Sequence, residues 1–143
     1  MTAITSARSD VDSPPPVVCV VDDDESVRES LTSLLRSFGF DGRAFASAED
    51  LLEGAFPRDA DCILLDVTMP GMSGVELHEY LLEQGERIPV VFITARFEET
   101  LRSRFLALGA IACLIKPFQE NELLTAVNAA VLAKRAGSIE KKS

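Results

Sequence analysis

The sequence lacks the apolar segments that membrane insertion and secretion require. No apolar run approaches the roughly 18 residues needed to cross a bilayer. The N-terminus also lacks a charged stretch followed by an apolar one, which would mark a signal peptide. Together these absences lead us to expect a cytoplasmic protein with no membrane partner.

Cysteine and histidine are scarce. The three cysteines are an odd number, form no CxxC pair and lie inside apolar runs, and only one histidine is present to help bind a metal. We therefore expect Cys19, Cys62 and Cys113 to be buried, reduced thiols. The histidine, His78, lies among polar neighbours, so we expect its side chain to be exposed.

Basic residues are outnumbered by acidic ones. The chain carries 14 Lys and Arg against 23 Asp and Glu, a formal net charge of -9, whereas proteins that bind nucleic-acid phosphates present a basic surface. We therefore expect no nucleic-acid binding by this chain itself. Residues 134–143 carry four basic side chains and one acidic one, which we interpret as a solvated basic tail.

The length of 143 residues is that of one average domain. Residues 1–16 are rich in Thr, Ser and Asp and end in three prolines, so we predict a disordered N-terminal extension there. The folded domain is predicted at residues 17–133, because no apolar period continues through Gly137 and Ser138.

Five short apolar segments predict β-strands. Most are rich in Val or Ile, and the middle ones are apolar at every position, as parallel strands covered on both faces are. The segments are Val17–Val21, Arg43–Phe45 (the weakest), Cys62–Leu65, Val90–Ile93 and Ile111–Ile115. The stretch after each strand has the apolar spacing of an amphipathic helix, so we predict five strands alternating with five helices.

Several residues mark where these helices begin and end. Asp24 is expected to cap the first helix, and Ser47, followed three residues later by Asp50, the second. Gly39 and Gly109 are expected to end the first and fourth helices. The apolar stripe of the third helix comprises Val75, Leu77, Leu81 and Leu82.

The alternation of strands and helices predicts an α/β fold, with a parallel sheet and helices on both faces. Right-handed crossovers leave few strand orders possible. For five strands we predict the flavodoxin-like (βα)5 arrangement with strand order 2-1-3-4-5. Its switch point lies between the first and third strands, and ligands bind there, beyond the carboxyl ends of the strands.

Carboxylates follow the two strands at this switch point. Asp22 and Asp23 come after the first strand and Asp66 after the third. At about 4 Å and an effective dielectric near 20, each pair would repel by up to roughly 4 kcal/mol, so a cation should occupy the hollow between them. A few hard oxygen ligands, completed by water, suit Mg²⁺.

The residues after the other strands extend this site. Thr94, after the fourth strand, offers a hydroxyl, and Lys116, after the fifth, a positive charge for phosphoryl oxygens. Each of these residues has an ordinary structural interpretation when it is taken alone. Thr94 could be a helix cap, Lys116 a solvated surface lysine and Asp66 a loop acid. A carboxylate beside Mg²⁺ can attack phosphorus, and phosphoryl transfer needs mainly alignment and charge neutralisation. The set therefore predicts phosphorylation of one of these aspartates.

Four motifs occur along the chain in the order VVDDDESVR, LLDVTMPGMSG, FITA and IKPF. With this spacing the sequence resembles the receiver domain of response regulators in two-component signalling, over about residues 17–133. It is most similar to receivers of the nodulation and nitrogen-fixation regulator type, through VRESL and MPGMSGVEL. The joint occurrence of four separate motifs makes the resemblance specific.

The resemblance implies a phosphorelay function. A sensor histidine kinase or a phosphotransfer protein would donate a phosphoryl group from a phosphohistidine to Asp66. Asp23, Asp66 and the main-chain carbonyl of Thr68 would bind Mg²⁺ directly. Asp22 would take part through water. The domain would be a switchable binding module and not a turnover enzyme, since it would catalyse only its own phosphorylation and dephosphorylation.

The resemblance also implies how the phosphoryl group is held and sensed. Thr94, Ala95 and Lys116 would contact its oxygens, and the peptide after the lysine would be cis, a state that only proline adopts readily. The switch would consist of Thr94 and the residue three positions before the lysine. That residue is usually Tyr or Phe, whereas here it is Cys113. The Cys113 thiol has no ring that could change rotamer together with Thr94. We therefore expect the signal of phosphorylation to pass through the loop after Thr94 or not to be transmitted.

The sequence leaves several functions open and does not indicate the output partner. The domain could belong to a longer DNA-binding transcriptional regulator. It could be a haloacid-dehalogenase-like phosphatase, although that family has a second Asp where this chain has Thr68. It could also bind its partners without phosphate. By analogy with other receivers, two copies could pair through the fourth helix, fifth strand and fifth helix.

Overall fold

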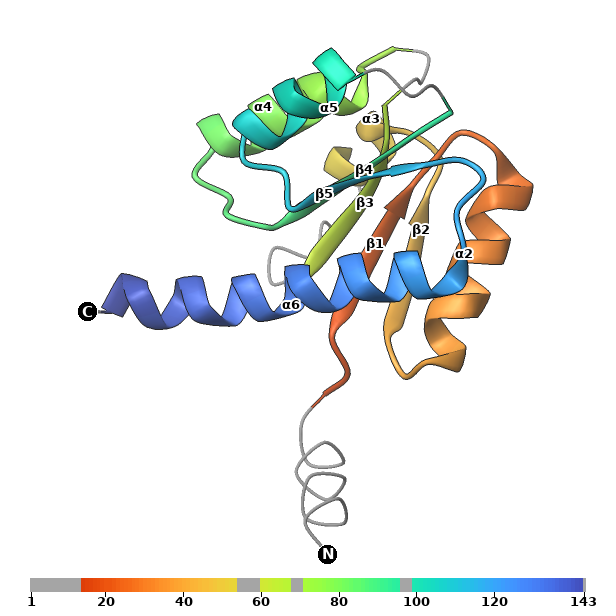
Figure 1. Cartoon of the computed structure of the whole chain (residues 1–143), viewed down its shortest axis with the longest axis horizontal. Coiled ribbons are helices and arrows are strands. Elements are labelled where there is room, and N and C mark those ends of the chain that lie inside the picture. Colours follow the sequence, from red (N-terminus) through yellow and green to blue (C-terminus); the bar gives the residue numbers. More distant parts are fainter. Residues whose placement is uncertain (1–13, 54–59, 68–70, 96–98, 143) are drawn as a thin grey trace, which may run out of the picture.

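The computed structural model describes residues 14–53, 60–67, 71–95 and 99–142. Strands and helices alternate along the chain (Figure 1), which confirms the predicted α/β class. In chain order the elements are β1 (Val17–Val21), α2 (Glu25–Ser37), β2 (Asp41–Phe45), α3 (Ala48–Glu53), β3 (Cys62–Asp66), α4 (Gly74–Glu83), β4 (Val90–Thr94), α5 (Glu99–Ala107), β5 (Ala112–Ile115) and α6 (Glu120–Lys142).

The strands form one parallel sheet in the order β2-β1-β3-β4-β5, which confirms the predicted flavodoxin-like order. The register pairs Val21 of β1 with Leu65 of β3 and Thr94 of β4 with Ile115 of β5. Because parallel strands run in the same direction, their carboxyl ends meet at one edge of the sheet. The acidic residues after β1 and at the end of β3 therefore start from the same edge.

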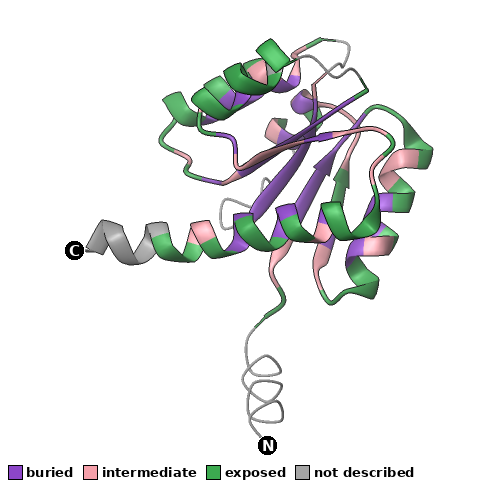
Figure 2. Cartoon of the chain, viewed as in Figure 1, coloured by how far each residue is buried: buried purple, intermediate pink, exposed green. Residues whose placement is uncertain are grey.

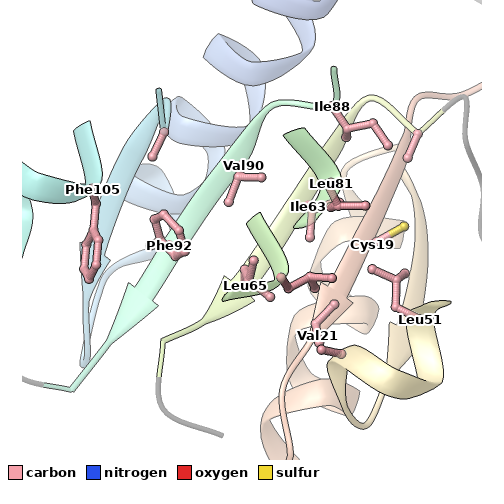
Figure 3. Close-up of a cluster of buried hydrophobic side chains, with 14 residues drawn as sticks. Cys19, Val21, Leu51, Ile63, Leu65, Leu81, Ile88, Val90, Phe92 and Phe105 are labelled. Carbon is pink, nitrogen blue, oxygen red and sulfur yellow. The ribbon is translucent and has the colours of Figure 1, made fainter. Parts of the chain in front are cut away.

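Helices cover both faces of the sheet (Figures 1 and 2). One face packs against α3, α4 and α5, and the other against α2 and α6. Successive strand residues point to opposite faces, so Val21 lies in the first core and Val20 in the second. Figure 3 shows the first core, where the ring centroids of Phe92 and Phe105 are 4.6 Å apart. Burying each such side chain stabilises the fold by about 1.5–3 kcal/mol.

Short-range signals set the helix ends as predicted. The Asp24 carboxylate accepts hydrogen bonds from the backbone N–H groups of Ser26 and Val27 and caps α2. Ser47 Oγ accepts the N–H of Asp50 at 3.0 Å, at the start of α3. Gly39 follows α2 with φ +91°, a left-handed conformation that glycine adopts without steric cost.

The buried face of α4 differs from the predicted one. His78 is only 3% exposed, and its ring lies edge-on to Phe92 with centroids 5.5 Å apart, so the expectation of an exposed histidine is wrong. Leu82, expected in the apolar stripe, is 47% exposed. The buried residues of α4 are Gly74, Leu77, His78 and Leu81. This spacing marks one side of a helix, and the largely apolar body of the imidazole lets it share that side.

The cysteines are reduced, as predicted. Cys19 and Cys62 are buried, whereas Cys113 is only partly buried. Burial raises the pKa of the Cys62 thiol far above its ordinary value, and it also raises the pKa of Cys113. Both thiols are therefore protonated near neutral pH, which makes them poor nucleophiles.

The last helix is longer than the sequence pattern predicts. The pattern ends the domain at residue 133, but α6 continues to Lys142, so the basic segment 134–143 is helical through that residue. Leu132 is 68% exposed, and in Figure 1 the last turns extend beyond the sheet. A helix satisfies its own backbone hydrogen bonds, so it can continue past the residues that pack on the sheet.

The predicted domain limits at residues 17 and 133 stay predictions. Much of the predicted N-terminal extension, residues 1–13, lies outside the described residues. Within the described part of the chain, no helix combines the length and the apolar character needed to cross a membrane.

Candidate functional site

Two carboxylates start from neighbouring strands. Val21 pairs with Leu65 in the sheet, so the next residues, Asp22 and Asp66, are neighbours at the carboxyl edge. The backbone N–H of Asp22 donates to the carbonyl of Phe45 at 3.2 Å, which continues the pairing of β1 with β2 past the end of the strand. The sheet therefore sets the backbone positions of both acids.

The predicted acidic cluster forms. Carboxylate oxygens of Asp22, Asp23 and Asp66 all lie within 4.8 Å of one another. Asp22 is 2% exposed and Asp66 8% exposed, whereas Asp23 is exposed. The cluster thus combines two buried acids with one exposed acid. Carboxylates this close repel one another, and their oxygens are hard donors of the kind that Mg²⁺ prefers.

Asp22 is held through both of its carboxylate oxygens. Oδ1 accepts the backbone N–H of Asp24 at 2.9 Å, and Oδ2 lies 3.4 Å from Nζ of Lys116. The guanidinium of Arg28 donates to the Asp22 carbonyl at 2.8 Å. These contacts fix the side chain and the backbone of the most deeply buried acid in the cluster.

Lys116 follows β5, the strand at one edge of the sheet, and reaches the acidic cluster from there. Its backbone N–H donates to the carbonyl of Thr94 at 2.8 Å, and the Lys116–Pro117 peptide is cis, as the resemblance implies. Because β3 and β4 lie between β1 and β5, the contact from Lys116 to Asp22 crosses the carboxyl ends of both strands. Asp66 and Thr94 are the last residues of those strands. The lysine charge therefore lies over the predicted phosphoacceptor edge.

The remaining predicted residues fall in three places. Thr94 is 6% exposed at the end of β4, and Ala95 follows it at the surface. Cys113 lies beside Phe92 in the sheet register and packs at the border of the first core. It is therefore separate from the acidic cluster. Thr68, the predicted main-chain metal ligand, lies outside the described residues, so that assignment stays a prediction.

Two contacts at this edge are absent from the sequence predictions. One joins Arg28 to Asp22, six residues apart, and the other joins Glu49 of α3 to Met72, 23 residues apart. Neither separation matches a helix or strand period, because each contact runs between two different elements. Predicting these two contacts would have required both the strand order and the rotation of each helix about its axis.

The chain matches the response regulator receiver domain family over residues 18–128. It belongs to this family, as its motifs predict, and the match favours a receiver over a haloacid-dehalogenase-like phosphatase. Receiver domains are the signalling domains of two-component systems.

Similar proteins agree with this assignment. The chain is 41% identical to the transcriptional regulatory protein TdiR of Thauera aromatica over 118 residues, 82% of this chain and 52% of TdiR. It is 42% identical to nodulation protein W of Bradyrhizobium diazoefficiens over 114 residues, 80% of this chain and 50% of that protein. The chain thus spans about half the length of these curated relatives.

Solved structures support the same fold. A structure of the response regulator StyR is similar with a TM-score of 0.79 and 44% sequence identity, over 90% of this chain and 66% of StyR. Nodulation protein W is a relative of the nodulation type that the motifs predict, and StyR is a response regulator. Fold and family are therefore established on independent grounds.

Proposed function

We propose that Asp66 accepts a phosphoryl group from a phosphohistidine of a sensor histidine kinase or phosphotransfer protein, in the presence of Mg²⁺. The observation that carries this proposal is the convergence of three carboxylates within 4.8 Å, with Lys116 3.4 Å from one of them. Carboxylates this close repel one another, and a bound cation relieves that repulsion. Asp66 is the acid that lies between Asp22 and Thr94 at the strand ends.

For Mg²⁺ we propose the roles that the receiver family implies, and the contacts of Asp22 agree with them. Both oxygens of Asp22 have protein partners, which suits a supporting role through water. Asp23 and Asp66, with the main-chain carbonyl of Thr68, are the direct ligands. Held by these residues, Mg²⁺ would supply the positive charge that lets an anionic nucleophile approach an anionic phosphoryl group.

The transfer itself exchanges one bond for another. A carboxylate oxygen of Asp66 forms a bond to phosphorus, while the bond from phosphorus to the donor imidazole nitrogen breaks and its electron pair leaves with the imidazole. The Lys116 ammonium, the Thr94 hydroxyl and the Ala95 N–H bind phosphoryl oxygens. These groups stabilise charge without further covalent steps.

Intact-mass analysis tests this proposal. The protein is incubated with acetyl phosphate and Mg²⁺, and we expect a gain of one phosphoryl group that Asp66→Asn abolishes. Asp24→Asn is the matched control, because Asp24 caps α2 and lies outside the cluster. This variant should be phosphorylated like the wild type. An unchanged mass of the wild type would point to a receiver that binds its partners without phosphate.

Phosphorylation is proposed to change binding, with no turnover of a separate substrate. The surface formed by α5, β5 and α6 is the proposed region for pairing of two copies, by analogy with other receivers. Thr94 and Cys113 are the proposed switch residues. Size-exclusion chromatography with and without beryllofluoride tests this output, and a larger species with beryllofluoride is expected.

A second candidate function is control of transcription as the receiver of a longer DNA-binding regulator. The relatives TdiR and nodulation protein W are about twice as long as the matched region, and TdiR is a transcriptional regulatory protein. An immunoblot of the producing cells against this domain tests the proposal. A band clearly above the 15.5 kDa of this chain would favour it, and fractionation of the same lysate tests the proposed cytoplasmic location.

A further inference from the structure

Glu49 contacts the backbone that follows the phosphoacceptor. It lies on α3, which is separate in sequence from the strands that carry the acidic cluster. Its Oε2 accepts the backbone N–H of Met72 at 3.0 Å, across 23 residues of sequence, and the contact is partly buried. Met72 belongs to the segment that leads from Asp66 at the end of β3 to the start of α4. The contact therefore joins α3 to the segment after Asp66.

The segment lies directly against the Glu49 carboxylate. Gly71 has φ +77°, a conformation that residues with a Cβ rarely adopt. A Cβ placed on Gly71 would lie 2.8 Å from Glu49 Oε2, closer than such atoms normally approach. The backbone at Gly71 and Met72 is thus shaped to receive this carboxylate.

The other end of the segment is tied to Asp66 itself. A Cβ added at Gly74 would overlap the carbonyl oxygen of Asp66, and the Gly74 N–H points to the carbonyl of Val67 at 3.4 Å. Ser73 begins α4 with a capping box shared with Glu76. Because Gly74 packs on the Asp66 backbone, a shift of Met72 would be transmitted to Asp66 through only a few bonds.

The Glu49 carboxylate is ionised at neutral pH. Its pKa lies below the ordinary value, first because the Met72 N–H donates to the charged form, and then because its own N–H and the Ser47 hydroxyl do so. Hydrogen bonds to an ionised acceptor are roughly twice as strong as neutral ones. Glu49 can therefore hold the segment against thermal displacement.

We propose that Glu49 is a positioning residue for phosphorylation of Asp66. By holding Met72, it keeps Asp66, whose backbone packs against Gly74, in the position that binds Mg²⁺ and accepts the phosphoryl group. Glu49 touches neither the metal nor the phosphoryl group in this role. The inference rests on the proposed phosphorylation of Asp66 and adds a residue of α3 to it.

Three substitutions separate the contact of Glu49 from its charge. Glu49→Ala removes both, Glu49→Asp keeps the charge but is too short to reach Met72, and Glu49→Gln keeps an oxygen acceptor without the charge. Glu53→Ala is the matched control, because it removes an exposed carboxylate from the same helix. Circular dichroism defines a temperature at which all variants are folded, and the measurements are made there.

Two quantities are measured for each variant. Calorimetry gives the dissociation constant for Mg²⁺, and intact mass over time gives the rate of phosphorylation by acetyl phosphate. We expect Glu49→Ala and Glu49→Asp to weaken Mg²⁺ binding and slow phosphorylation by about three- to tenfold, the effect of one net hydrogen bond. Glu53→Ala should stay within about twofold of the wild type, and Glu49→Gln, which keeps a weaker neutral acceptor, should fall between the wild type and Glu49→Ala. A residue with a purely structural role would lower thermal stability without changing the Mg²⁺ affinity of the folded protein.

Failure of the inference can be told from failure of the proposed function. If the wild type is phosphorylated and Glu49→Ala or Glu49→Asp matches it in both quantities, the positioning role is overturned and the phosphorylation of Asp66 stands. If the wild type gains no phosphoryl group, the proposed function and this inference fall together.

Discussion

Nζ of Lys116 lies 3.4 Å from Oδ2 of Asp22, although 94 residues separate them. Asp22 is 2% exposed, and the lysine side chain is 30% exposed. An acid buried this deeply depends on the cation beside it, because charge is poorly solvated away from water. The lysine thus supplies the countercharge for a buried carboxylate, and it lies at the strand ends that carry the site.

Replacing this lysine should destabilise the metal-free protein. We expect Lys116→Met to lower the free energy of unfolding by about 1–3 kcal/mol, since Asp22 loses its cation. Mg²⁺ should recover part of this loss, so the stabilisation by Mg²⁺ should be larger in the variant than in the wild type. Urea unfolding with and without Mg²⁺ measures both effects.

An exposed ion pair provides the control for the lysine substitution. Arg43 and Asp41 lie 2.9 Å apart with side chains 46% and 36% exposed. Arg43→Met should change stability by less than about 1 kcal/mol. Equal losses in the two variants would show that burial of Asp22 does not matter.

Removing one acid of the cluster should stabilise the metal-free protein, the opposite of the effect expected for the lysine substitution. Asp66→Asn relieves repulsion with Asp22 and Asp23, so we expect Tm in metal-free buffer to rise by about 3–6 °C, equivalent to roughly 1 kcal/mol. In the wild type, Mg²⁺ should raise Tm as well. Differential scanning calorimetry measures both shifts, and a fall in both would contradict the cluster.

The contact between Gly74 and Asp66 predicts a steric effect. Gly74→Ala places a methyl group against the Asp66 carbonyl oxygen, which is backbone and cannot move aside cheaply. We expect a loss of about 3 kcal/mol in the free energy of unfolding, together with slower phosphorylation. Urea unfolding and intact mass over time measure the two effects.

Gly85 is the matched control for this substitution. It has φ +80°, but a Cβ there would meet nothing within 4 Å. Gly85→Ala should therefore lose only about 1–2 kcal/mol through backbone strain and keep the wild-type rate of phosphorylation. A larger loss in Gly85→Ala than in Gly74→Ala would contradict the close approach at Asp66.

The buried histidine predicts a pH dependence. Burial lowers the pKa of His78 below its ordinary value, while the charge of Glu79 opposes this shift, and Phe92 of β4 is apolar. Protonation therefore favours the unfolded state, so the wild type should lose stability as the pH falls below about 6.5.

The variant His78→Leu isolates this titration from that of the carboxylates. Its advantage in stability over the wild type should grow by about 1 kcal/mol between pH 7 and pH 5. Some advantage is expected at pH 7 as well, because Nδ1 of His78 lacks a hydrogen-bond partner among the described residues. Chemical unfolding at several pH values checks this, and a difference that stays constant with pH would rule the titration out.

Most of the fold and much of the candidate site follow from local patterns. The apolar run Val17–Val21 followed directly by Asp22 and Asp23 predicts both a buried strand and a charged strand end. The rule that ligands bind at the switch point then predicts that Asp66 lies beside them. The acidic cluster meets that expectation, because the carboxyl edge of a parallel sheet is set by strand order.

The sequence by itself determined which residues form strands and helices, where α2 and α3 are capped, and which acids follow the strands, since these properties depend on neighbours in the chain. Only the tertiary structure decided that His78 is buried, that Lys116 reaches Asp22, and that Glu49 holds Met72. These three outcomes depend on how each helix is rotated against the sheet and on distances between elements. Apolar periodicity indicates the buried face of a helix only approximately, and neither it nor composition sets the distance between two elements.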